Sequence, residues 1–443
     1  MSTNIHDDQT RLTDLDQLVD YIAAGGKPRE KWVVGTEHEK IGWWPKRGAY
    51  PDYFDPAGIG PLLEAMARDG GWEVTREAGA IIALARDGAT VTLEPGGQLE
   101  LSGAPLRTLA ETEGELDAHF AEIQKYSAPL GIEWSGLGLA PIGPPTAMPK
   151  MPKQRYDRLC AHLMTHGKMG LHMMRQTCTV QANLDFADET DAFRKLRLAL
   201  YVQPFVLAAF ANSPVVEGRL VPEKTFRGRI WEDTDPDRWR FPPSFLAPGG
   251  RFIDYVNWAV DVPMPFLRRE GQYLDCGGLT FRTFMAQGFG DYYARLGDFA
   301  VHLSALFPDV RLKQYLEVRA ADMGDRDHVL ALPAFTTGLL YDEAALNAGL
   351  ALFDAVTYDD WWTLRHAVPT EGLDARLRGR PLSAWGVELL KLARAGLNRR
   401  EPGATHLLDV LDRDVPEGRS PADRLREIYT GDPAALLAAT RIA

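Results

Sequence analysis

VTLEPGGQLELSGAP, residues 91–105, decides the fold because it alternates polar and apolar residues around a Pro-Gly-Gly turn. In a β-strand, side chains of one parity share a face. The polar parity carries Thr92, Glu94, Gln98, Glu100 and Ser102. The apolar parity carries Val91, Leu93, Leu99 and Leu101. The stretch therefore predicts strands that bury one face and present carboxylates on the other.

Pro95-Gly96-Gly97 interrupts this alternation. Glycine inside a strand marks a bulge or a place where a ligand or another backbone comes close. By spacing alone, an ordinary hairpin turn explains the same residues equally well. The acids on either side favour the first interpretation, in which the backbone leaves room for a ligand.

Three other segments repeat the alternation. Their polar parities carry Glu37 and Glu39 in GTEHEK, Thr179, Gln181, Asn183 and Asp185 in CTVQANLDF, and Tyr315, Glu317 and Arg319 in YLEVRA. A sheet with one solvated face explains alternation by itself. However, no lysine occupies a polar-parity position in the four stretches, and clustered carboxylates repel one another unless a cation joins them. Hard oxygen ligands of this kind suit Mg²⁺.

The composition is typical of a globular protein whose partners are small molecules. Its 443 residues are 45% hydrophobic and 25% charged, and the net charge of −12 disfavours a broad grip on nucleic acid or an anionic membrane. The N-terminus has no apolar signal region, no run of residues suits a membrane span, and three cysteines fit a reduced compartment. We expect a cytoplasmic protein with no nucleic-acid or membrane partner.

The pattern along the chain predicts a single domain over residues 1–443. We expect an N-terminal helix within about 1–30, a sheet-containing core over about 31–330 and a mostly helical part over about 331–443. Helices are predicted at about 106–126 and from about 188 onward, and residues 219–250 are predicted to be a loop. Residues 311–322, RLKQYLEVRAAD, are predicted to form one strand.

Common nucleotide and zinc motifs are absent from the sequence. It contains neither a G-x-x-x-x-G-K-[ST] loop nor a G-x-G-x-x-G turn after a strand, and GTEHEK lacks the H-E-x-x-H spacing of zincins. We therefore expect no zinc, and His38 is predicted to be a core histidine. Arg155 and Arg227 stand at loop edges, where an arginine binds carboxylate or phosphate or forms a surface ion pair.

A set of motifs in fixed order gives the sequence a family resemblance. They are VGTEHEKIG, LEPGGQLELSGAP, MPKQRY, QTCTVQANLDF, RIWEDTDPDR, RLKQYLEVRAAD and LPAFTTGLLYD, between about residues 33 and 342. Together they resemble the plant-type glutamate-cysteine ligases, or γ-glutamylcysteine synthetases, of plants and many proteobacteria. The resemblance implies an α+β fold with a glutamine synthetase-like core, a curved and mainly antiparallel sheet with helices on its outer face.

The same resemblance implies a reaction and its residues. The enzyme would join L-glutamate to L-cysteine with ATP and Mg²⁺, through a γ-glutamyl phosphate, in the first step of glutathione synthesis. Arg155, Arg227 and Arg319 are implied as catalytic residues. The implied substrate-binding residues are Arg155, Tyr156, Gln181, Asn183, Arg227 and Trp231. The implied metal ligands are Glu37, Glu39, Glu94, Glu100 and Glu317.

Two alternatives remain open from the sequence. A related ligase could join glutamate to a different amine, because amine choice depends on pocket shape rather than on the acidic strands. A non-catalytic binding module could also keep this fold. The sequence does not distinguish a monomer from a homodimer.

Overall fold

One nine-stranded sheet forms the centre of the protein, whose computed structural model describes residues 8–443. Its strand order is β12-β13-β7-β1-β5-β4-β3-β2, with β6 also paired to β1. The strands are β1 (Val34–Trp43), β2 (Glu73–Glu77), β3 (Ala80–Arg86), β4 (Ala89–Leu93), β5 (Leu99–Ser102), β6 (Glu133–Ser135), β7 (Val180–Leu184), β12 (Val310–Leu312) and β13 (Leu316–Val318). Every pairing within it is antiparallel.

The register of the sheet places the predicted polar residues next to one another. Glu39 lies opposite Glu100, and Glu37 lies opposite Gln181 on the other neighbouring strand. Asn183 lies opposite Glu317. The prediction that four distant segments share one polar face is therefore confirmed.

The other face of the sheet is buried under helices. Helix α3 (Leu109–Ser127) packs on β1, α6 (Glu189–Ala209) on β12 and β13, and α12 (Arg326–Leu340) on β7. His38 and Lys40 point to this face and are 1% and 0% exposed, so His38 is the core histidine that its parity predicted. Lys40 Nζ lies 2.9 Å from His38 Nδ1. The predicted α+β fold, with a mainly antiparallel sheet and outer helices, is confirmed.

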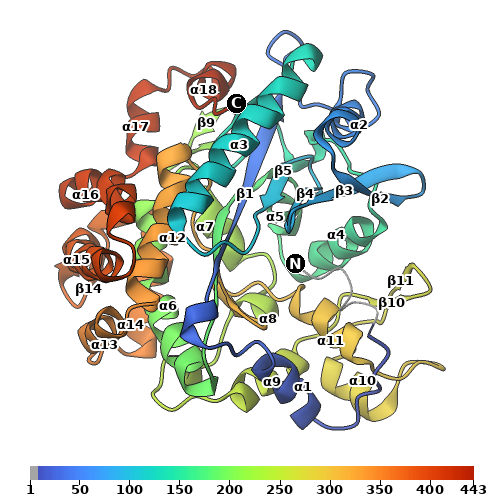
Figure 1. Ribbon diagram of the computed structural model, residues 1–443. Coiled ribbons are helices and arrows are strands. Elements are labelled where there is room, and N and C mark those ends of the chain that lie inside the picture. Colours follow the sequence, from blue (N-terminus) through green and yellow to red (C-terminus); the bar gives the residue numbers. More distant parts are fainter. Residues whose placement is uncertain (1–7) are drawn as a thin grey trace.

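Helices on the polar side carry residues over the sheet. These are α4 (Gln154–His166), α5 (Gly170–Gln176) and α7 (Phe226–Glu232). Helices α8 (Pro236–Trp239), α9 (Phe252–Asp261), α10 (Phe281–Gln287) and α11 (Leu296–Leu303) follow them along the chain. The two-stranded hairpin β10 (Leu267–Arg269) and β11 (Gln272–Leu274) lies near α4 and α11 (Figure 1). Two further hairpins are β8 (Val215–Val216) with β9 (Arg219–Leu220), and β14 (Arg376–Leu377) with β15 (Arg380–Pro381).

The C-terminal helices gather on the side of the molecule away from α2 (Ile59–Gly70) and the β2–β3 hairpin (Figure 1). They are α13 (Glu343–Leu352), α14 (Tyr358–Glu371), α15 (Leu382–Arg400), α16 (Asp409–Asp414), α17 (Pro421–Ile428) and α18 (Pro433–Ala439). The N-terminal helix within the described residues is α1 (Asp16–Ala23). No helix in residues 8–443 has the length and apolar character needed to cross a bilayer.

Two local predictions were wrong. Residues 219–250 contain α7 and α8, which begin where the side chains of Thr225 and Asp235 accept hydrogen bonds from the first backbone N–H groups. Residues 311–322 do not form one strand, because the chain turns between β12 and β13 and pairs Arg311 with Glu317.

The Pro-Gly-Gly segment is a turn that another backbone approaches. Glu94 N donates to Gln98 O at 2.9 Å, and Gly97 has φ +86°. A Cβ atom on Gly96 would lie 2.0 Å from the carbonyl oxygen of Arg175, at the end of α5. Residue 96 must therefore be glycine because of a neighbouring helix, and the expectation that the glycines leave room for a ligand is corrected.

Candidate active site

The polar face of the sheet is the floor of a cavity of about 250 Å³. It is lined by Glu37, Glu39, Glu94, Gln98, Glu100, Lys153, Arg155, Tyr156, Leu159, Met173, Met174, Thr177, Thr179, Gln181, Arg227, Trp231, Ser304, Phe307, Arg311 and Arg319. All residues predicted for the site line this cavity except Asn183 and Glu317. These two lie in the same polar face beside the cavity lining, where Asn183 Nδ2 donates to Glu37 Oε1 at 2.6 Å.

Four carboxylates form one side of the floor, which we call the acidic half: Glu37, Glu39, Glu94 and Glu100. Neutral groups hold them in place. Glu100 accepts hydrogen bonds from Thr92 Oγ1 and Ser102 Oγ, both at 2.9 Å. Glu39 accepts one from the backbone N–H of Thr179 at 2.9 Å. Over residues 8–443, no ion pair within 4.0 Å involves the acidic half, so these carboxylates repel one another without a bonded counter-charge.

The acidic half binds protons more readily than ordinary carboxylates. Burial, with repulsion from Glu317 and Glu100, raises the pKa of Glu37 to about 7. Burial and the charges of Glu94 and Glu100 raise the pKa of Glu39 well above its usual value. The pKa of Glu100 is raised by burial and by Glu94. A divalent cation at this place would relieve both the repulsion and the lost hydration.

The other side of the floor, which we call the cationic half, consists of Arg311, Lys313, Glu317 and Arg319. Arg311 Nε donates to Glu317 Oε2, Lys313 Nζ lies 3.1 Å from Oε1, and Arg319 Nη1 lies 3.0 Å from Oε2. Burial alone would raise the pKa of Glu317, but the charges of Arg311, Lys313 and Arg319 lower it well below its usual value. One carboxylate therefore holds three cations at the edge of the cavity.

Two arginines reach the cavity from helices rather than from the sheet. Arg155 lies in the first turn of α4, and its Nη2 donates to Ser304 Oγ at 2.8 Å. Arg227 lies in the first turn of α7 and is 3% exposed. Its guanidinium stacks on Trp231 with 4.6 Å between its carbon and the ring centre. These helices bring positive charge into the lining of the cavity.

Several lining residues were not predicted from the sequence. Lys153 precedes α4, and its Nζ donates to Leu93 O at 3.0 Å and to Tyr156 OH at 3.1 Å. Arg311 and Lys313 share the parity of Glu317, so extending the alternation four residues upstream would have found both. The apolar wall contains Leu159, Met173, Met174 and Phe307. These residues sit on helices and loops, where strand parity gives no signal.

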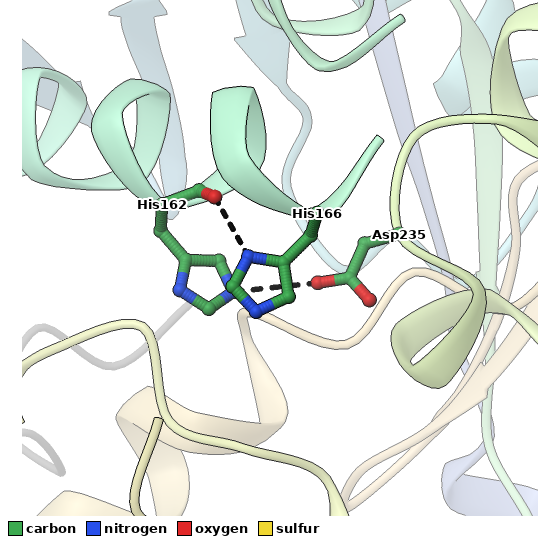
Figure 2. Close-up of side chains that lie close together, drawn as sticks. All are labelled: His162, His166 and Asp235. Carbon is green, nitrogen blue, oxygen red and sulfur yellow. Dashed lines mark hydrogen bonds and ion pairs between the residues drawn. The ribbon is translucent and has the colours of Figure 1, made fainter. Parts of the chain in front are cut away.

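A histidine cluster lies outside the cavity, on the far part of α4 (Figure 2). His162 and His166 stack with ring centres 3.9 Å apart, and His162 Nε2 lies 3.3 Å from Asp235 Oδ2. Arg238, which is 0% exposed, donates from Nε to Asp235 at 2.7 Å and from Nη2 to His162 Nε2 at 2.9 Å. A guanidinium thus already fills the place of a cation, and we assign the cluster to holding α4 against α8.

The chain belongs to glutamate-cysteine ligase family 2, whose family model matches residues 33–438. It is similar to the chloroplastic glutamate–cysteine ligase of Brassica juncea, with 41% identity over 94% of this chain and 81% of the relative. The chloroplastic enzyme of Arabidopsis thaliana is 41% identical over 94% and 80%. Glutamate–cysteine ligase B of rice, also chloroplastic, is 39% identical over 94% and 84%.

A solved structure shares the fold. Glutamate–cysteine ligase from Francisella tularensis, in a complex with AMP, has a TM-score of 0.55 over 92% of this chain and 87% of that one, at 14% identity. The family resemblance predicted from the motifs is confirmed, and the protein is an enzyme of the ligase class.

The expected cytoplasmic location is wrong. The curated relatives named above are chloroplastic proteins. Few cysteines and a polar N-terminus do not specify a compartment, because a stromal enzyme has the same physical requirements as a cytoplasmic one.

Proposed function

We propose that the protein joins the γ-carboxylate of L-glutamate to the amine of L-cysteine with ATP, forming γ-glutamylcysteine, ADP and phosphate. This is the first step of glutathione synthesis. The observation that carries the proposal is that one cavity holds four carboxylates without bonded cations on one side and a set of arginines on the other. Such a cavity suits the transfer of a phosphoryl group between anions, which needs charge neutralisation more than covalent chemistry.

The acidic half fits Mg²⁺. Its donors are hard oxygens, and burial together with mutual repulsion raises the pKa values of Glu37, Glu39 and Glu100, which a bound cation would offset. Glu37, Glu39, Glu94 and Glu100 would hold the ion. Glu317, the fifth ligand that the resemblance implied, is instead bonded to Arg311, Lys313 and Arg319 in the cationic half. Mg²⁺ bound there would neutralise the phosphate oxygens of ATP. Gln181 accepts from Arg319 at 3.0 Å and joins the two halves as a neutral neighbour.

The arginines bind and orient the anions. Arg155 and Arg227 hold the carboxylates of glutamate and the phosphoryl group in transfer, and Arg319 binds the phosphates of ATP. A γ-carboxylate oxygen of glutamate attacks the terminal phosphorus while the bond to ADP breaks. The cysteine amine then attacks the acyl carbon, phosphate leaves, and the nitrogen releases a proton. Tyr156 and Trp231 wall the amino-acid pocket and keep water away from the acyl phosphate.

The test is phosphate release from ATP with glutamate and a panel of amines. Release that requires glutamate and cysteine together supports the proposal. Equal or faster turnover with another amine would instead support a ligase of different amine specificity, and no turnover with any amine would support a binding module. Omitting Mg²⁺ should abolish release. Size-exclusion chromatography would separate the two oligomeric states, monomer and homodimer, that stay open.

A further inference from the structure

Arg227 is fixed by groups outside the cavity floor. Its Nη1 donates to Ala320 O at 2.9 Å and its Nη2 to Arg319 O at 3.0 Å. Its Nε is buried and has no hydrogen-bond partner among residues 8–443. Two backbone carbonyls therefore set the plane of the guanidinium.

Asp322 lies beside this arginine, with Oδ1 3.8 Å from Arg227 Nη1. It is 1% exposed and does not line the cavity. Its Oδ2 accepts from Asn212 N at 2.8 Å and Ser213 Oγ at 2.6 Å, and its Oδ1 accepts from Thr225 Oγ1 at 3.0 Å. One carboxylate thus joins the segment after β13, the segment after α6 and the start of α7.

The donors that bind Asp322 also hold the first turn of α7. Thr225 is the N-cap of α7, and its Oγ1 accepts from Gly228 N at 3.0 Å. Ser213 Oγ accepts from the backbone N–H of Arg227 at 3.1 Å. Loss of the Asp322 charge would therefore shift the backbone that carries Arg227 and Trp231. Arg155 is held separately, by Ser304.

We propose that Asp322 is a positioning residue for Arg227, because it holds the first turn of α7 against the segment after β13 and so fixes the guanidinium over the cavity. The inference rests on the proposed function, since it takes Arg227 as a residue that binds substrate. A misplacement of about 1 Å is enough to lower a rate by about 100-fold.

The test is a double-mutant cycle read as kcat/KM for glutamate. Asp322→Asn should lower kcat/KM by about 10- to 100-fold in the wild-type and Arg155→Lys backgrounds. In the Arg227→Lys background the same change should lower it by less than about 3-fold, because the residue through which Asp322 acts is already impaired. An equal loss in all three backgrounds would overturn the proposal, since a general loss of structure has that result.

Two further variants separate positioning from folding. Ser213→Ala removes one donor to Asp322 and should show the same dependence on Arg227 with a smaller loss. Asp191→Asn is the matched control, because Asp191 is also buried, accepts a backbone hydrogen bond and pairs with Lys195 at 2.8 Å. It should lower thermal stability without changing kcat/KM. A kinetic loss in Asp191→Asn equal to that in Asp322→Asn would contradict the proposal.

Failure of the proposed function gives a different result. If wild-type protein releases no phosphate with glutamate and any amine, the ligase proposal fails. Calorimetric binding of glutamate then replaces kcat/KM in the same cycle. If Arg227→Lys changes neither turnover nor binding, Arg227 does not bind substrate and the proposal for Asp322 is overturned with it.

Discussion

The acidic and cationic halves of the cavity floor lie on one sheet, on either side of β7, and yet they bond their carboxylates in opposite ways. In the acidic half, four carboxylates share a small area, and three of them accept hydrogen bonds from neutral hydroxyl, amide and backbone donors. In the cationic half, three cations surround Glu317 alone. The difference follows from the β12–β13 hairpin, which places Arg311 directly opposite Glu317.

This difference shows that burial alone does not determine whether a carboxylate is protonated. Removal from water by itself would raise the pKa of both Glu37 and Glu317, but the pKa of Glu37 is raised and that of Glu317 is lowered. The acidic half is arranged to accept a cation, and the cationic half carries surplus positive charge that suits an anion. Four predictions test the comparison, from the largest expected effect to the smallest.

The largest effect is expected in the acidic half. Glu37→Gln and Glu100→Gln should each lower Mg²⁺-dependent phosphate release by about 1,000-fold, or roughly 4 kcal/mol of transition-state stabilisation. The measurement is turnover at increasing Mg²⁺, with circular dichroism to verify the fold. Glu122→Gln, at an ion pair with Arg86 outside the cavity, is the control and should retain activity. Full activity in both acidic-half variants would contradict the metal assignment.

In the cationic half, the main effect of the same substitution should be on stability. Glu317→Gln leaves three buried or half-buried cations without their carboxylate and should lower the free energy of unfolding by about 3 kcal/mol. Urea denaturation measures it, and Glu100→Gln should not destabilise the metal-free protein. Equal destabilisation by both variants would show that the two halves do not differ.

The two halves should respond to pH with opposite signs. Because the folded pKa of Glu37 is about 7, above its unfolded value, the folded protein binds the extra proton. The metal-free protein should therefore lose stability as pH rises from about 4.5 to 7, by on the order of 3 kcal/mol from this residue. The lowered pKa of Glu317 gives stability that is present above pH 4.5 and is lost as pH falls further.

Urea denaturation at a series of pH values between 3 and 8 measures how the free energy of unfolding changes with pH in both ranges. Glu37→Gln should reduce the decline toward pH 7 without abolishing it, because Glu39 and Glu100 also have raised pKa values. Glu317→Gln should reduce the loss of stability in acid. Saturating Mg²⁺ should abolish the decline in wild-type protein, because the ion replaces the proton. Parallel curves for wild type and Glu37→Gln would contradict the raised pKa.

The smallest effect is expected for a single cation of the cationic half. Lys313→Met should raise KM for ATP by about 3- to 10-fold, with kcat little changed, because Arg311 and Arg319 remain and the side chain of Lys313 is partly solvated. Steady-state kinetics with varied ATP measure it. Lys27→Met, at an ion pair with Asp185, is the control. A rise in KM for glutamate instead would place the amino acid, rather than ATP, at the cationic half.

Strand alternation predicted much of the acidic half and little of the rest. Parity is a local property of a strand, so Glu37, Glu39 and Glu100 could be placed on one face without knowing the strand order. The turn between β12 and β13 depends on tertiary pairing and could not be predicted. Arg311 and Lys313, by contrast, share the parity of Glu317 and lay within reach of the alternation. The family resemblance, rather than periodicity, identified Arg155 and Arg227. Their arrival over the sheet depends on how α4 and α7 pack, which no local pattern specifies.

The number of residues in strand β1 determines which of its side chains face the cavity. Its odd-numbered Glu37 and Glu39 face the cavity, while His38 and Lys40 lie under α3. Deleting one residue before Glu37 would exchange the two sets, sending two carboxylates into the apolar layer and an imidazole and an amine into the cavity. A shift in the length of the strand thus changes every one of its side chains at once, whereas a substitution changes one. Insertions and deletions in β1 should therefore be far rarer than substitutions among active enzymes of this family.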